Sequence, residues 1–171
     1  DIYLTGNPQI TFFKVVYRRH TNFSMEAIEQ TINGSVAVNG NSSVTISRNG
    51  DLVGKIYVVN SSSTSTTNGS EILSEVELEI GGQRIDKHYA EYNQMVNELA
   101  TPDSKAAAFK NMIGDIGTAG TADSTGPVMT QYPLNFWFCR NPGLALPLIA
   151  LQYHEVKVKF TWGSSAAKGV D

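Results

Sequence analysis

Hydrophobic and polar positions alternate most regularly in two segments of the chain, residues 75–80 and 152–162. In the first segment, Val76, Leu78 and Ile80 alternate with glutamates, which is the period of a strand with one buried and one solvated face. In the second segment, Val, Phe and Trp alternate with polar residues in the same way. Both segments are therefore predicted to be strands.

Six further strands are predicted from runs of β-branched and aromatic residues that lie between turn signals. They are residues 9–19, 23–32, 44–46, 52–59, 83–85 and 128–139. The pairs Asn49-Gly50 and Gly81-Gly82 are typical of tight turns. Residues 60–70 consist mainly of Ser, Thr and Asn, and this composition predicts an exposed loop.

The spacing of apolar residues changes to a helical period after Asp86, which can cap a helix. The apolar side chains of this helix fall on one stripe: Tyr89, Tyr92, Val96 and Leu99. A second, shorter helix is predicted over residues 101–112, with Pro102 in its first turn. Eight short strands and one helical segment predict an all-β fold, an antiparallel eight-stranded jelly-roll sandwich with a short helical insertion.

The chain has 171 residues, 41% hydrophobic and 17% charged, which suits one domain with its own core. We expect the domain to span residues 1–163 and residues 164–171 to form a linker. The net charge is −3, and the basic run at residues 18–20 is too short for a phosphate-binding surface. No apolar stretch approaches the ~20 residues that span a bilayer. We therefore expect no direct nucleic-acid contact and no membrane insertion.

Residue types that carry catalysis or bind metals are scarce and scattered. His20, His88 and His154 lie far apart and match no metal-ligand spacing. Cys139 is the single cysteine, and its place in a predicted strand favours a buried hydrophobic role over a nucleophile. Nucleophile-elbow, P-loop and dinucleotide-binding motifs are absent from the sequence. We expect no catalytic residues, no cofactor-binding residues, no cofactor and no metal site.

The glutamates Glu75, Glu77 and Glu79 share one face of a predicted strand, as paired catalytic acids would. A solvated face is the simpler interpretation and the one we favour. Repulsion along the row would then be eased by water or by a Lys or Arg of a partner.

Five Asn-x-Ser/Thr sequences occur, at Asn22, Asn33, Asn41, Asn60 and Asn68. Such sequences arise by chance in a chain rich in Ser and Asn, and a protein made in the cytosol does not use them for glycosylation. Asn60 and Asn68 rank first as glycosylation sites, because they lie in the predicted exposed loop.

Three blocks of sequence carry a resemblance to a known family. They are DIYLTGNPQITFFKVVYRRHTNF at residues 1–23, EIGGQRID at 79–86 and PLNFWFCRNPGLALPLIALQYHE at 133–155. In this order, and over about a third of the chain, they resemble the major capsid proteins of the large nucleocytoplasmic DNA viruses, the double jelly-roll lineage.

The resemblance implies an N-terminal jelly roll that the linker would join to a second one, although nothing after Trp162 resembles the second. It also implies a homotrimer of pseudo-hexagonal outline that tiles an icosahedral shell. The partners would be sister subunits, neighbouring capsomers and minor capsid proteins, in a virion assembled in the host cytoplasm. On this interpretation we expect subunit contacts at Arg18, Arg19, Trp137 and Arg140.

Two other functions remain open for a jelly roll. A carbohydrate-binding module would need exposed aromatic side chains, for which Tyr89, Tyr92 and Tyr132 are the candidates. A cupin-type enzyme would need a bound metal.

Overall fold

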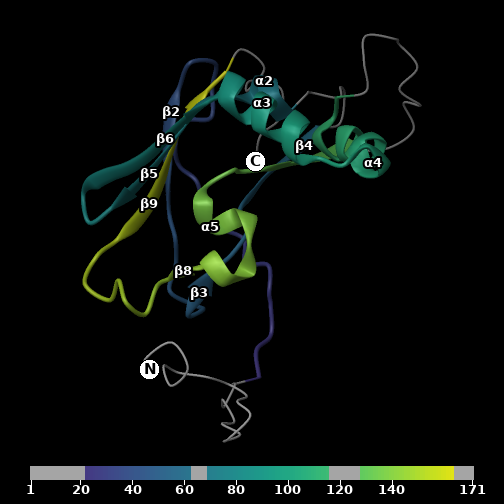
Figure 1. The fold of residues 1–171 in the computed structure, drawn as a ribbon. Coiled ribbons are helices and arrows are strands. Elements are labelled where there is room, and N and C mark those ends of the chain that lie inside the picture. Colours follow the sequence, from purple (N-terminus) through teal and green to yellow (C-terminus); the bar gives the residue numbers. More distant parts are fainter. Residues whose placement is uncertain (1–21, 63–68, 116–127, 164–171) are drawn as a thin grey trace, which may run out of the picture.

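A computed structural model describes residues 22–62, 69–115 and 128–163. Within these ranges the chain forms mostly antiparallel strands, with a few short helices (Figure 1). The elements are, in order, β1 (Asn33–Gly34), β2 (Asn41–Thr45), β3 (Leu52–Val53), β4 (Tyr57–Ser62), α2 (Gly69–Ile72), β5 (Leu73–Ile80), β6 (Gln83–Tyr89), α3 (Ala90–Ala100), α4 (Asp103–Ile113), β7 (Val128–Pro133), α5 (Trp137–Arg140), the 3-10 turn η1 (Pro142–Leu144), β8 (Leu146–Pro147) and β9 (Val156–Trp162).

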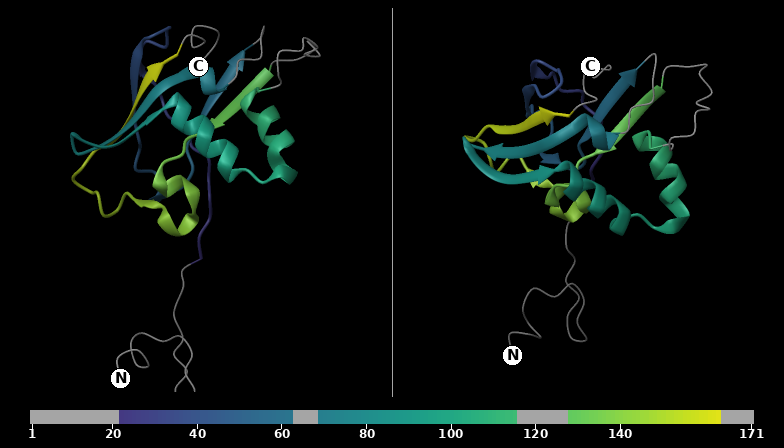
Figure 2. Two further views of the ribbon diagram at one scale, coloured as in Figure 1. Left: turned by 45° about the horizontal axis from the view of Figure 1, so that its top comes forward. Right: turned by 90° about the horizontal axis from the view of Figure 1, so that it is seen from above.

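In the described residues, the strands form one large sheet and two small ones. The large sheet has the order β1-β2-β9-β5-β6, and all its neighbouring strands are antiparallel. The pairs β3–β8 and β4–β7 lie beside it (Figures 1 and 2). In Figure 1, α3 and α4 lie at the upper end, the β3–β8 pair lies at the lower end, and α5 lies between them. The fold is the predicted jelly-roll class.

The core lies between the large sheet and the smaller pairs, and the alternation in β5 and β9 explains it. Val76 and Leu78 of β5 are fully buried, and every second residue of β9 from Val156 to Trp162 is buried. The indole N–H of Trp162 donates to Ser42 Oγ at 2.8 Å, so the largest core side chain has a partner for its polar atom. Both strands were predicted, and both predictions are confirmed.

The helical insertion is confirmed, but its first helix begins later than predicted. Asp86 does not cap α3, because its carboxylate accepts the Lys87 N–H (2.8 Å) and contacts His88, and β6 continues to Tyr89. The predicted apolar stripe is also wrong, since Leu99 is 81% exposed and Asn93 is the buried residue of α3. The second helix begins after Pro102 and ends at Gly114, whose φ of 79° suits glycine.

Four predicted segments differ from the structure. The strand predicted over 52–59 is divided into β3 and β4, which belong to different sheets. Residues 23–32 form no strand, and Phe23 is 89% exposed in a segment that extends away from the body (Figure 1). The strand predicted over 128–139 ends at Pro133, and Trp137 and Phe138 lie in the helical turn α5. The predicted loop 60–70 begins as the end of β4 and finishes in α2. The predicted strand 9–19 and the linker 164–171 lie outside the described residues.

Candidate functional site

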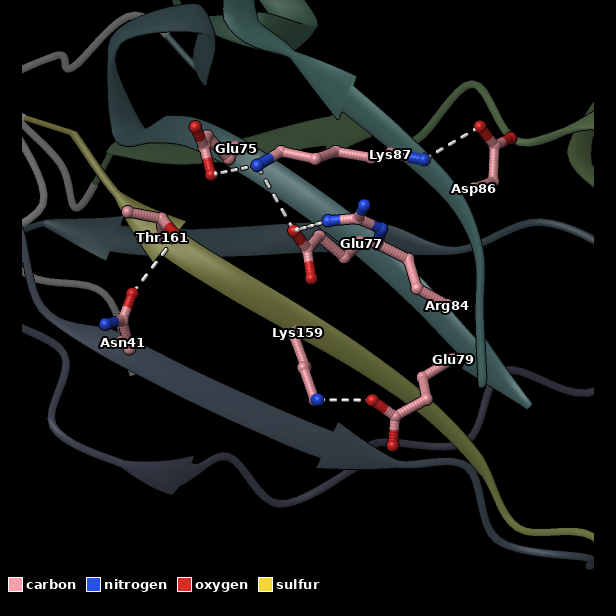
Figure 3. A network of polar contacts seen from close by, with 9 residues as sticks. All are labelled: Asn41, Glu75, Glu77, Glu79, Arg84, Asp86, Lys87, Lys159 and Thr161. Carbon is pink, nitrogen blue, oxygen red and sulfur yellow. Dashed lines mark hydrogen bonds and ion pairs between the residues drawn. The ribbon is translucent and has the colours of Figure 1, made fainter. Parts of the chain in front are cut away.

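The outer face of the five-stranded sheet carries the three glutamates of β5 between basic residues of the neighbouring strands (Figure 3). Lys87 Nζ of β6 lies 2.8 Å from Glu75 Oε2 and 3.2 Å from Glu77 Oε1. On the other side, Lys159 of β9 pairs with Glu79. The predicted repulsion is therefore relieved within the chain, by strands in register, and requires no partner.

Further ion pairs continue this network along the same face. Arg84 Nη1 lies 3.5 Å from Glu77 Oε1, and Lys157 Nζ lies 2.9 Å from Glu155 Oε2. The hydrogen bond to Glu75 raises the pKa of Lys87, so this ammonium stays charged at neutral pH. Each β5 carboxylate contacts a cation, which is the arrangement of a structural ion-pair network. Catalytic acid pairs instead need one carboxyl kept protonated.

A second region surrounds α5, where two predicted contact residues lie on one helical turn. Arg140 is exposed and donates from Nη2 to the Tyr92 hydroxyl at 3.0 Å. Trp137 is half-buried and packs edge-on against Phe138, with ring centroids 5.2 Å apart. The structure thus brings Trp137 and Arg140 together beside α3. Arg18 and Arg19 lie outside the described residues, and a subunit contact at all four positions stays a prediction.

Beneath α5 lies a buried histidine that sequence reasoning had set aside as structural. His88 Nε2 lies 3.0 Å from Asp86 Oδ2, and its ring packs against Tyr92 and Phe136, with centroids 4.7 and 4.9 Å away. Burial lowers the pKa of His88, and the charge of Asp86 opposes that effect. His154 is exposed. Across ranges 22–62, 69–115 and 128–163, no cluster of His, Cys, Asp or Glu is suited to a metal ion.

Three asparagines that sequence reasoning missed join α3 to the segment before α5. Asn135 Nδ2 donates to Asn97 Oδ1 at 2.9 Å and to Asn93 Oδ1 at 3.3 Å. Asn93 is 1% exposed, so this amide network is buried at one end. The i, i+4 spacing of Asn93 and Asn97 places both on one helix face, and it was the available signal.

Arg48 binds the backbone of residues 148–155, the lower loop, and sequence reasoning also missed this role. Its guanidinium donates to the carbonyls of Leu151 (2.8 Å), His154 (2.9 Å) and Gln152. The same loop exposes two large apolar side chains, Ile149 and Tyr153. Arg48 and backbone hydrogen bonds, such as Leu148 N–H to the Asp51 carbonyl (2.8 Å), thus hold a loop that presents apolar surface.

The glycosylation and carbohydrate candidates are divided between interior and surface. Tyr89 is 49% exposed and Tyr92 is half-buried. Asn60 pairs with Thr130 across β4–β7 and is 2% exposed, so its predicted place in an exposed loop is wrong. Asn68 lies outside the described residues, and glycosylation of either stays a prediction. Tyr132 is also 2% exposed, and burial raises its pKa to about 12. Burial likewise raises the pKa of Cys139, which argues against a reactive thiolate.

A family model described as "Major capsid protein N-terminus" matches residues 11–168. The chain belongs to this major capsid protein family. Among its relatives, the major capsid protein of Pyramimonas orientalis virus is 51% identical over 97% of this chain. That of Paramecium bursaria Chlorella virus 1 is 50% identical over 96% of this chain. The chain spans 44% and 38% of the lengths of these two family members.

Solved structures of the family have the same fold. The chain matches VP54 of PBCV-1, in a crystal structure fitted into a reconstruction of the virophage Sputnik, with a TM-score of 0.71 and 43% identity. A quasi-atomic model of the PBCV-1 capsid matches with a TM-score of 0.70. Each match covers 92% of this chain and 39% of the solved chain. The alternatives of a carbohydrate-binding module and a cupin-type enzyme are not favoured by these matches.

In the described parts of the chain, no helix is long and apolar enough to span a bilayer.

Proposed function

We propose that this chain is the N-terminal jelly roll of a major capsid protein and that its role is structural, as part of the icosahedral shell of a large DNA virus. The observation that carries the proposal is the family match over residues 11–168 together with the shared fold of VP54. The share of VP54 that the chain covers leaves room for a second jelly roll in the whole protein.

The assembly unit in this proposal is a homotrimer of pseudo-hexagonal outline, packed against neighbouring capsomers and minor capsid proteins. The exposed surface of α5 and the lower loop with Ile149 and Tyr153 would form side contacts. Burial of apolar surface contributes roughly 25 cal/mol per Å², before the cost of association. Repetition of modest contacts around a closed ring makes a stable shell from reversible steps. The assembly site would be the host cytoplasm and the final location the virion.

The proposed role includes no catalysis. Each glutamate on the sheet face contacts a Lys or Arg, and Cys139 is a half-buried thiol whose pKa is raised. These groups support a framework, because none of them is poised as an acid, base or nucleophile.

Light scattering of the full-length protein tests this proposal. We expect a mass three times that of the subunit, and a lone monomer at high concentration would contradict the trimer. The variant Arg140→Ala should weaken the trimer while leaving each subunit folded. Lys105→Ala, an exposed residue of α4, is the matched control and should leave the trimer intact. Equal trimer stability in both variants would remove Arg140 from the interface.

A further inference from the structure

His88 lies where three parts of the fold meet. It belongs to β6, and its ring packs against Tyr92 of α3 and Phe136, the residue directly before α5. The residue is 6% exposed. Separation of α3 or α5 from the sheet would therefore expose this ring, so its protonation state is coupled to the packing of both helices.

The hydrogen-bond geometry assigns the proton of the neutral ring to Nε2, which lies 3.0 Å from Asp86 Oδ2. The other nitrogen, Nδ1, is buried and has no hydrogen-bond partner. A second proton on this ring must go to Nδ1, where the new N–H would have no acceptor. Buried donors without a partner are costly, and a buried cation adds to that cost.

The groups facing His88 have opposing effects on its charge. Asp86, on the same strand, favours the charged imidazolium, while Arg140 of α5 opposes it. Tyr92 of α3 is neutral and already accepts the Arg140 hydrogen bond. On the β5 side the register partner is Val76, which is apolar and fully buried. The half-buried Asp86 carboxylate thus favours the charged form of His88. Burial, the unpartnered Nδ1 and the nearby Arg140 guanidinium oppose it.

We propose that His88 is a pH-sensitive clasp, which holds α3 and α5 on the sheet while neutral and releases them when it gains a proton. The inference concerns the domain alone, and it holds whether or not the chain assembles. Burial places the pKa of folded His88 below the ordinary value of 6.5. Between the folded pKa and the ordinary value, the unfolded state binds more protons than the folded state. The contribution of His88 to the free energy of unfolding is therefore complete above pH 6.5 and falls as the pH drops toward the folded pKa.

The first test follows the imidazole Cε1–H signals of the intact chain by NMR between pH 8 and 4. We expect the His88 signal to titrate below pH 6.5, and at still lower pH in Asp86→Asn, because that change removes the group that favours the proton. Titration of His88 at or above pH 6.5 would overturn the proposal. So would a shift to higher pH in Asp86→Asn.

The second test compares unfolding of the wild type and His88→Phe at pH 7.5 and pH 5. Phenylalanine retains an aromatic ring at this position and cannot be protonated. We expect the folded-to-unfolded ratio of the wild type to fall more, by about tenfold for each pH unit between the two pKa values of His88. His154→Gln, at an exposed histidine, is the matched control and should follow the wild type. Parallel losses in wild type and His88→Phe would contradict the clasp.

Hydrogen exchange of the wild type gives a readout that remains if His88→Phe does not fold. Between pH 7.5 and pH 5, protection factors should fall in α3 and α5 before they fall in β9. A uniform fall, or none, would show that His88 does not control these helices.

Discussion

Two regions carry paired polar groups: the outer face of the five-stranded sheet, and the junction of β6, α3 and α5 that holds His88, Asn93 and Asn135. The groups on the sheet are paired in contact with water, and those at the junction are paired in the interior. On the sheet, Glu75 and Glu77 reach Lys87 at the surface, where water also solvates the charges. At the junction, His88 and Asn93 are enclosed by side chains, where His88 contacts Asp86 and Asn93 accepts from Asn135. Loss of a partner on the sheet is compensated by water, whereas loss at the junction leaves a buried group unpaired. Burial thus decides which polar contacts the fold depends on.

The largest loss in the free energy of unfolding should come from a substitution in the apolar layer behind the sheet face, which both regions share. Trp162→Ala removes a fully buried ring and the hydrogen bond to Ser42, and we expect a loss of about 3–5 kcal/mol in the free energy of unfolding. Urea denaturation measures this loss. The neighbouring Thr161→Ala changes a partly exposed side chain and should cost far less. Similar losses in both variants would mean that β9 is not buried on one face.

The junction should be next in sensitivity. Asn135→Ala removes the donor to Asn93 and Asn97 and leaves a buried carbonyl oxygen unpaired, at a cost of about 1–3 kcal/mol. Urea denaturation is again the measurement, with the exposed Asn111→Ala as the matched control. If the two asparagine variants were equally stable, the buried network would contribute nothing.

The sheet face should be less sensitive than either. Glu79→Gln removes one ion pair with Lys159, and we expect a smaller loss than in Asn135→Ala. This loss should disappear in about 1 M salt, where charges at the surface are screened. Thermal unfolding at low and high salt checks both points. A large loss that salt does not change would show that the pair behaves as a buried one.

The smallest global effect should come from Arg48. Arg48→Ala removes three hydrogen bonds to the carbonyls of the lower loop, but it leaves the core intact. Amide exchange of residues 148–155 should accelerate about threefold to tenfold, since a net hydrogen bond contributes ~0.5–1.5 kcal/mol. Exchange in β5 should not change. An unaltered loop would show that other contacts fix it.

The regular parts of the fold were predictable because their signals are local. The two-residue period defines β5 and β9, and Pro102 and Gly114 mark the ends of α4. The basic partners of the glutamates were not predictable in the same way. Lys159 meets Glu79 across 80 residues of sequence, and only the register of the folded sheet brings them together.

The junction was harder to predict for a different reason. The run Phe136-Trp137-Phe138 has the composition of a strand, yet the strand ladder ends at Pro133 and α5 begins at Trp137. Its surroundings depend on Asn93 and Asn97, about 40 residues earlier in the chain. Likewise, an isolated His88 gives no signal that Tyr92 and Phe136 will enclose it. Local pattern predicts elements, while enclosure depends on tertiary contacts.

The central position of β9 has a consequence for how the protein is made. β9 pairs with β2 across 120 residues of sequence and with β5 across 80, and it separates these two strands in the sheet. During translation, β2 and β5 must leave the ribosome long before the strand that joins them exists. Until residue 162 emerges, their apolar faces and open edges are available to chaperones and to other nascent chains.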